Sequence, residues 1–384
     1  MLLKVCVAIL LLSVPALATP EFSRRYKVES CNVCHTVVPK LNERGMDFQA
    51  RGYRPDPLLN LEEQPTVPLS VWLTQNVDRR LPKDVDNHFT GKVEVISGGT
   101  LGDSLNYFVE WRALSLESKT DGTLRDRSGR FEDLWVSWKI DPRWSLTLGQ
   151  YRPLLQVEPG RKLSIGTNVL YDLSLPGEKA DTARKTGLRS FSTNGRSPGF
   201  TLSYQSVSGE QAMDGLFHQV TVPFPGEFSL PLTAEARHEA SFELEGAPKG
   251  VVLETYYRRG LNSIGAHGFV DSNRWMAVLL GELNFGDLYA TAGVGLDDVR
   301  DDKKPLRVRS SLELEYLPTL EDQTWRPGVG LRLENVSHSG HPVVFVPYAV
   351  LASPNLGEFT SLLQLEYRTE PGGERLRLDY SVMF

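Results

Sequence analysis

From about residue 66 to the C-terminus, apolar and polar residues alternate with a period of two. In residues 306–316, one face collects Leu306, Val308, Leu312, Leu314 and Tyr316, and the other collects Arg307, Arg309, Ser311, Glu313 and Glu315. Residues 106–113, 144–148 and 359–368 show the same alternation. Such segments predict amphipathic β-strands, and turn-rich stretches such as Pro371-Gly372-Gly373 separate them.

The number and length of these segments predict an all-β transmembrane barrel. We expect about 16 antiparallel strands, within a range of roughly 14 to 18, most of them about 9 to 12 residues long, which is enough to cross a bilayer when tilted. A soluble β-sandwich would also alternate, but charges on nearly every polar face leave too little apolar core for one. The apolar faces are therefore expected to meet lipid and the polar faces to line a wet lumen. Eight aromatic residues are candidates for the interfacial girdles: Trp72, Tyr107, Trp135, Trp144, Trp275, Tyr316, Trp325 and Tyr367.

The last strand is the most specific part of this pattern. Leu376, Leu378, Tyr380, Val382 and Phe384 alternate with polar residues, and the chain ends on the aromatic. This ending resembles the terminal strand that the bacterial outer-membrane assembly machinery recognises. An outer-membrane location is expected.

The N-terminus predicts export. Lys4 precedes a short apolar run, and Ala16-Leu17-Ala18 has the small-x-small form of a cleavage site. Residues 1–18 are therefore predicted to be a signal peptide, because the run is too short for a membrane anchor. Cys6 would be lost with it, which leaves Cys31 and Cys34 in an exported compartment.

Composition narrows the possible functions. The 384 residues carry a net charge of −6, so the chain lacks the excess of positive charge that is typical of nucleic-acid-binding proteins. Three cysteines exclude a disulfide scaffold. After residue 20 no apolar run reaches about 18 residues, so a bundle of membrane helices is excluded.

The two remaining cysteines lie in one motif, Cys31-Asn32-Val33-Cys34-His35. C-x-x-C-H is the attachment signature of heme c: two thiols form thioethers to one porphyrin, and the adjacent histidine ligates the iron. A redox dithiol would need a βαβ context, and a zinc site would need a second Cys/His pair. A plain disulfide would not require His35. One covalent heme c is expected, with Cys31 and Cys34 binding it and His35 as the metal ligand.

The second axial ligand of the iron is left open. Met46 is the nearest candidate and lies in residues 41–48, which could form a short helix. The alternative is that Met46 only fills a gap against the porphyrin. His88 is a weaker candidate, and a five-coordinate iron remains possible. No catalytic residue can be named.

The chain divides into three parts: the signal peptide at 1–18, a monoheme cytochrome c segment at 19–65 and the barrel at 66–384. Pro55, Pro57, Pro65 and Pro68 mark the last junction. A segment of about 40 residues is too small to be comfortably stable alone, so a berth inside the barrel lumen is expected.

The heme segment resembles the fused cytochrome–porin family of outer-membrane iron oxidases. The residues that carry the resemblance are Phe22-Ser23-Arg24-Arg25-Tyr26, Cys31 to His35, Pro39-Lys40-Leu41-Asn42, Gly45, Phe48 and Gly52-Tyr53. The approach to the first cysteine, Lys27-Val28-Glu29-Ser30, departs from the Gln-Thr-Gly-like sequence usual in that family. The resemblance implies a ferrous iron oxidase in which heme takes an electron from extracellular Fe(II) and a periplasmic c-type cytochrome or other carrier receives it.

Three other functions remain open: an outward conduit that reduces extracellular metals, a porin channel with a heme-bearing plug, and a soluble β-rich cytochrome. Fusion of heme and barrel in one chain favours the iron oxidase, because a plain channel has no need of a redox group.

Two further regions stand out in the sequence. Acidic residues at Asp84 and Asp86, and at Asp297, Asp298, Asp301 and Asp302, suit iron chemically, but solvated loop charges are the simpler expectation. Residues 152–186 alternate weakly and form either a large surface loop or a segment folded into the lumen.

Overall fold

The computed structural model describes residues 22, 25–27, 33–53, 69–81, 88–118, 123–152, 163–165, 168–170, 196–207, 213–224, 226, 228–230, 250–271, 274–299, 306–318, 325–337, 343–353, 360–370 and 373–383. Several predicted features lie outside the described residues: the signal peptide, Cys31, Asp84, Asp86, Asp301, Asp302 and Phe384. The side chain of His88 also lies outside them.

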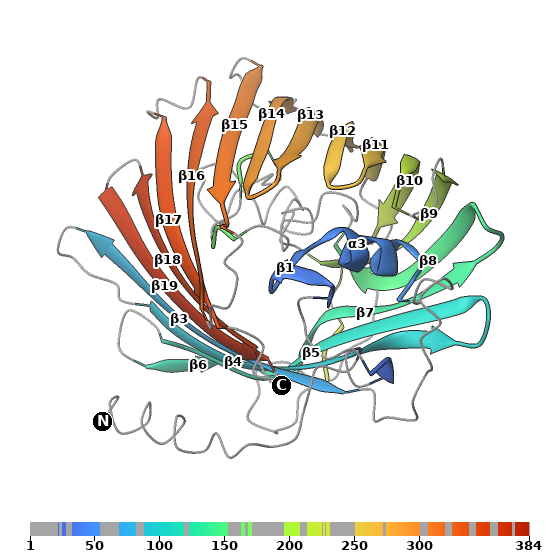
Figure 1. Cartoon of the computed structure of the whole chain (residues 1–384), viewed down its shortest axis with the longest axis horizontal. Coiled ribbons are helices and arrows are strands. Elements are labelled where there is room, and N and C mark those ends of the chain that lie inside the picture. The colour runs from blue at the N-terminus through green and yellow to red at the C-terminus, as the bar shows by residue number, and fades with distance from the viewer. Residues whose placement is uncertain are drawn as a thin grey trace.

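Most of the chain forms one closed antiparallel barrel (Figure 1). Its strands are β3 (Ser70–Leu81), β4 (His88–Leu101), β5 (Leu105–Ser118), β6 (Leu124–Asp126), β7 (Arg130–Lys139), β8 (Trp144–Tyr151), β9 (Ser197–Val207), β10 (Gly215–Pro223), β11 (Val251–Arg259), β12 (Asn262–Val270), β13 (Arg274–Phe285), β14 (Leu288–Val299), β15 (Arg307–Tyr316), β16 (Arg326–Val336), β17 (Val344–Ala352), β18 (Thr360–Glu370) and β19 (Gly373–Met383). β6 and β7 both pair with β5 and occupy one position, so the barrel has 16 strand positions. Pairing of β19 with β3 closes the ring, as predicted.

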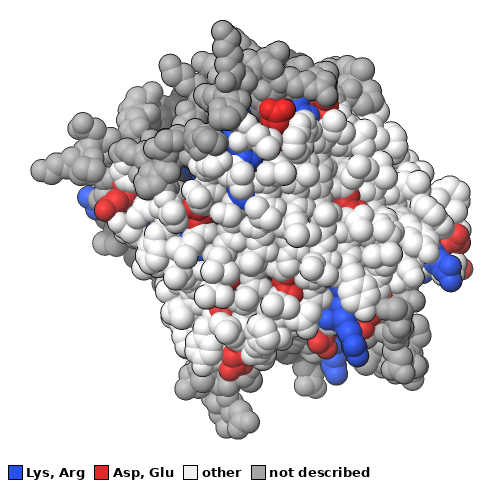
Figure 2. Space-filling model, turned by 90° about the horizontal axis from the view of Figure 1, so that it is seen from above, with Lys and Arg blue, Asp and Glu red and all other residues white. Residues whose placement is uncertain are grey.

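Most of the wall has apolar side chains outside and polar side chains inside, and the inward positions that are apolar pack on chain inserted in the lumen. In β15, Arg307, Arg309 and Glu315 are buried, whereas Leu312 and Leu314 are exposed. The described part of the face shown in Figure 2 accordingly carries few charged residues. Soluble proteins have the reverse arrangement, with apolar residues inside. A wall that faces lipid needs apolar residues outside, so this arrangement agrees with the predicted outer-membrane location.

A bulge interrupts the alternation in β5. Val93 pairs with Leu114 and Glu94 pairs with Arg112, so Ala113 has no opposite residue in β4. The alternation is therefore reversed after Ala113: Leu114 is exposed and Ser115 is buried, because one extra residue changes the side to which later residues point.

The aromatic girdle is only partly as predicted. Trp144, Tyr316 and Trp325 are exposed on the outside of the barrel. Trp135 instead stacks on Tyr53, which belongs to the N-terminal segment inside the lumen. Trp72 shares the inward side of β3 with Ser70 and Asp78, since alternate residues of a strand share one face.

The two ends of the barrel differ. The longest connections between strands, 152–196 and 224–250, join strand ends that lie at one end of the barrel. The opposite end carries short turns at 102–104, 260–261 and 286–287 and the start of β3. In outer-membrane barrels short turns are periplasmic and long loops are extracellular.

No helix among the described residues is both long and apolar enough to cross a membrane.

Candidate functional site

Residues 33–53, called the lumen segment below, lie inside the ring of strands (Figure 1). They form β1 (His35–Val37), β2 (Lys40–Leu41) and α3 (Glu43–Ala50). The segment lies at the short-turn end: Arg326, which begins β16, donates to the Thr36 carbonyl at 2.9 Å, and a Cβ on Gly260 would lie 2.9 Å from the Glu43 carboxylate. The expected short helix and the expected position of this segment in the lumen are both observed.

Asn42 connects the C-x-x-C-H motif to the helix that follows it. Its side-chain oxygen caps α3 by accepting from the Gly45 amide at 3.0 Å. Its backbone amide donates to the Cys34 carbonyl at 3.0 Å, and its side-chain amide donates to the Val33 carbonyl at 3.2 Å. The start of α3 therefore fixes the end of the motif.

Gly45 allows this close packing. A Cβ at this position would lie 2.0 Å from the Cys34 carbonyl oxygen, a distance that no side chain can occupy. The asparagine and glycine that follow C-x-x-C-H thus have a structural purpose, because they hold the helix against the motif.

His35 is prepared to act as a metal ligand. Its Nδ1 lies 3.3 Å from the Pro39 carbonyl, an acceptor that places the ring proton on Nδ1 and leaves Nε2 with its lone pair. Burial lowers the pKa of His35 to about 4, and hydrogen bonds to the backbone of Pro39 and Lys40 only partly oppose that shift. The imidazole is therefore neutral at pH 7, which is the form that binds iron.

Met46, the candidate for the second axial ligand, is buried and faces the barrel wall. Its Sδ accepts a hydrogen bond from Arg258 Nη1 of β11 at 3.2 Å. Arg258 also reaches Glu282 at 3.2 Å. The contact agrees with a packing role for Met46, and iron ligation by this residue stays a prediction.

An aromatic cluster fixes one side of the lumen segment to the wall. Tyr53 stacks on Phe108 with ring centroids 5.5 Å apart and on Trp135 at 6.0 Å. Phe22 stacks on the same tyrosine at 5.2 Å, and Phe48 meets Phe22 edge-on. The aromatic residues around the motif thus pack together against β5 and β7.

Ionic and polar contacts fix the opposite side. The buried Lys40 ammonium pairs with the Glu315 carboxylate of β15 and lies 3.9 Å from the centroid of the Tyr289 ring. The Tyr289 hydroxyl lies 3.4 Å from the Thr36 hydroxyl. Together with Arg326, these groups hold the hairpin that carries His35.

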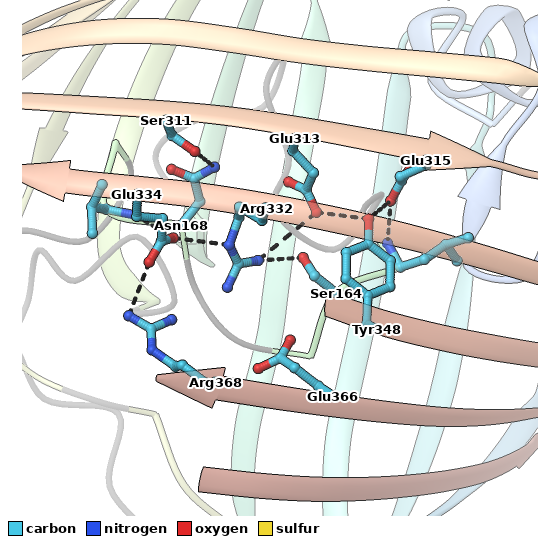
Figure 3. A network of polar contacts seen from close by, with 12 residues as sticks. Ser164, Asn168, Ser311, Glu313, Glu315, Arg332, Glu334, Tyr348, Glu366 and Arg368 are labelled. Carbon is cyan, nitrogen blue, oxygen red and sulfur yellow. Dashed lines mark hydrogen bonds and ion pairs between the residues drawn. The ribbon is translucent and has the colours of Figure 1, made fainter. Parts of the chain in front are cut away.

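A second piece of chain enters the lumen from the long connection between β8 and β9. Its described residues, 163–165 and 168–170, are called the inward segment below. Asn168 donates to Ser311 at 2.7 Å (Figure 3). The Val169 amide donates to Glu334 at 3.2 Å. Of the two alternatives for residues 152–186, these positions fold into the lumen.

Two apolar clusters form around these inserted pieces. The first unites Val37 and Leu163 with barrel residues Leu317, Tyr348, Val350, Ala352 and Leu362. The second places Leu170 among Phe217, Val252, Tyr256, Phe269, Met276, Val278 and Leu280. The lumen segment and the inward segment therefore share the first cluster with the wall, and the inward segment also takes part in the second.

Asp297 is not the solvated loop charge that was expected. It lies in β14, is completely buried and receives two hydrogen bonds from Arg274, at 2.6 and 2.7 Å, and one from Arg309 at 2.7 Å. β14 extends to Val299, and alternation turns Asp297 inward after Leu296. Among the described residues, no group of three or more His, Cys, Asp or Glu is arranged to hold a metal ion.

Sequence reasoning did not identify Glu315, Tyr289 and Arg258 as neighbours of the motif. Lys40 offered a weak signal, since it is a charged residue in the short stretch between His35 and α3. Glu315 offered none, because it is one of several inward polar residues in an alternating strand.

No family model and no curated protein matches this sequence. Among solved structures, the chain is similar to Salmonella typhi OmpF, determined in complex with daunomycin, with a TM-score of 0.52 and 10% identity over 82% of this chain and 97% of that one. It is also similar to the anion-selective porin of Comamonas acidovorans, with a TM-score of 0.51 and 13% identity over 83% and 98% of the two chains. At these identities the likeness shows the fold, which is that of the bacterial outer-membrane porins.

Proposed function

We propose that this protein is an outer-membrane electron-transfer protein that oxidises extracellular Fe(II). One Fe(II) gives up one electron and leaves as Fe(III), and one periplasmic c-type cytochrome or similar carrier gains that electron. The observation that carries the proposal is the position of Cys34 and His35: the end of a C-x-x-C-H motif lies inside a porin-like barrel, near its short-turn end.

The residues present fit a covalently bound heme. Cys31 and Cys34 would hold it through thioethers, and the neutral His35, with Nδ1 directed to the Pro39 carbonyl, would supply the axial nitrogen. When bound, heme c accepts and donates single electrons, which matches the one-electron Fe(II)/Fe(III) couple.

The rest of the chain positions and insulates this site. The wall separates the two aqueous sides with an apolar band about 25 Å tall. Lys40, Thr36 and Tyr53 fix the lumen segment to opposite sides of the wall, and the cluster around Val37 excludes water beside the motif. The short-turn end gives the site access to a periplasmic carrier, while the polar lumen face is suited to a hydrated cation that arrives from the other end.

The test mixes the purified, oxidised protein with Fe(II) without oxygen and follows the heme α-band. We expect the reduced band to appear rapidly, followed by its loss when an oxidised periplasmic carrier is added. A heme that dithionite reduces and Fe(II) does not reduce would contradict iron oxidation and would favour an outward conduit or another donor.

The porin architecture supports a second candidate, a diffusion channel in which the lumen segment is a plug. Steady single-channel conductance in planar bilayers, together with no electron exchange with Fe(II), would favour that function.

A further inference from the structure

We propose that Glu315 is a positioning residue that holds the His35 hairpin and the inward segment at one point of the barrel wall. The part of this proposal that concerns iron ligation rests on the proposed heme site, whereas the part that concerns closure of the lumen does not. Glu315 is 3% exposed and reaches three parts of the chain that are far apart in sequence.

The first contact is with the lumen segment. Glu315 Oε2 pairs with the Lys40 ammonium, which is itself buried. In the hairpin, Val37 pairs with Lys40 and His35 pairs with Leu41. Because the carbonyl that orients His35 belongs to Pro39, a displacement of Lys40 would also displace the acceptor that holds the imidazole.

The second and third contacts are with the inward segment and the wall. Glu315 Oε1 accepts from the Leu163 amide at 3.0 Å. The same oxygen lies 2.9 Å from the Tyr348 hydroxyl (Figure 3). Leu163 and Val37 also belong to the same apolar cluster. One carboxylate thus holds both inserted pieces beside a shared core.

The physical consequence is coupling between these pieces. A buried carboxylate is costly unless its charge is paired and its lone pairs accept hydrogen bonds. Glu315 meets both conditions only when Lys40, Leu163 and Tyr348 are in place together. Loss of one partner therefore weakens the binding of the others, and the two pieces close the lumen as a unit.

Glu313 provides a matched control for this role. It lies two residues before Glu315 on the same inward face, and its Oε1 also lies 2.9 Å from the Tyr348 hydroxyl, whose single proton is shared between the two carboxylates. Glu313 contacts Tyr348 and Arg332 of the wall, whereas Glu315 contacts Lys40 and Leu163. A general effect of losing a lumen carboxylate should therefore affect both positions alike.

The experiment compares Glu315→Gln, Glu313→Gln, Lys40→Met and the double variant Lys40→Met/Glu315→Gln in the full-length protein. Hydrogen exchange of residues 33–53 and 163–170 reports closure, bilayer conductance reports an opened lumen, and the midpoint potential reports the environment of the iron. Gel migration with and without heating confirms that each barrel is folded.

For Glu315→Gln we expect exchange in both segments to accelerate at least about tenfold, because one partner of a buried pair is removed. Conductance should rise and the midpoint potential should shift. The double variant should be no worse than the worse single variant, since contacting residues are not additive. Glu313→Gln should leave exchange in 33–53 within about twofold of the wild type, because its contacts with Tyr348 and Arg332 lie within the wall.

Equal effects of Glu315→Gln and Glu313→Gln would overturn the proposal, as would additive effects of Lys40→Met and Glu315→Gln. Failure of Fe(II) to reduce the protein would contradict the proposed function and leave these exchange and conductance results intact, so the two failures can be told apart.

Discussion

The lumen segment is attached to two sides of the barrel by different chemistry. Toward β5 and β7, Tyr53 stacks on Phe108 and Trp135. Toward β14, β15 and β16, Lys40 and Thr36 form ionic and polar contacts with Glu315 and Arg326. Burial of apolar surface on the aromatic side has little directional preference, whereas the charged and hydrogen-bonded contacts on the ionic side form in only one register of the hairpin.

This difference assigns the two sides separate roles. Apolar stacking contributes affinity in proportion to the area buried and tolerates small shifts. Buried charge pairs contribute less net free energy but penalise every arrangement in which they are not formed. The hairpin that carries His35 is attached on the ionic side, where a fixed position matters most for a residue proposed to bind iron.

The largest effect is expected from removing the two thiols that would bind heme, a change that leaves the aromatic and ionic contacts of the lumen segment intact. The double variant Cys31→Ser/Cys34→Ser should lose all covalently bound heme, because no thiol remains to form a thioether. Heme staining of a denaturing gel measures this loss. Unchanged heat-dependent gel migration would show that the barrel still folds, and heme that stays covalently bound would contradict the assignment.

A second change tests an ion cluster of the wall itself. Asp297→Ala should destabilise the barrel by about 3–5 kcal/mol, because it leaves Arg274 and Arg309 buried without their carboxylate. Denaturant unfolding in detergent measures the loss. The control Asp298→Ala alters the neighbouring residue, whose side chain faces outward by register, and it should cost far less. Similar losses of unfolding free energy for the two variants would show that the Asp297 ion cluster does not stabilise the barrel more than an outward carboxylate does.

The aromatic side is tested with Trp135→Ala. Loss of a half-buried indole that stacks on Tyr53 should weaken docking of the lumen segment by about 2 kcal/mol. Faster hydrogen exchange in residues 33–53 would report this. Trp138→Ala on the same strand removes a 48% exposed, outward indole and should leave that exchange unchanged. An equal response to both substitutions would argue against the stack as an anchor.

The smallest effect is expected on the polar side from Arg326→Gln. Loss of its bond to the Thr36 carbonyl should cost about 1 kcal/mol of docking free energy. Arg44→Gln, at an exposed position of α3, serves as the control and should have no measurable effect on exchange. If Arg326→Gln exceeds Trp135→Ala, the ionic side rather than the aromatic side supplies most of the affinity.

Much of the fold could be predicted because its signal is local. A strand places successive side chains on opposite faces, so the alternation in residues 306–316 already assigned Arg309 and Glu315 to the face opposite Leu312. Alternation alone does not reveal the bulge at Ala113, which shifts the pattern of the residues that follow, and it did not show that β14 extends through Asp297 to Val299. The turn-rich, charged ends of strands carry the weakest local signal.

The candidate site could be predicted only where its residues are neighbours in sequence. Cys31, Cys34 and His35 follow from the motif, and Asn42 and Gly45 belong to the same short stretch. The environment of His35, its neutral charge and its Pro39 acceptor needed the folded hairpin. Trp135 was assigned to the lipid interface because an aromatic residue in a barrel strand has the same local pattern whether it faces lipid or an inserted segment.

The sequence by itself determined a barrel with apolar residues outside, a polar lumen and one C-x-x-C-H motif, because each of these depends on residues a few positions apart. Only the tertiary structure decided which wall residues meet that motif. Glu315 and Lys40 are 275 residues apart, and they meet because strand register and barrel closure bring β15 opposite the hairpin. No local pattern encodes this contact, because it depends on the register of every strand pair around the barrel.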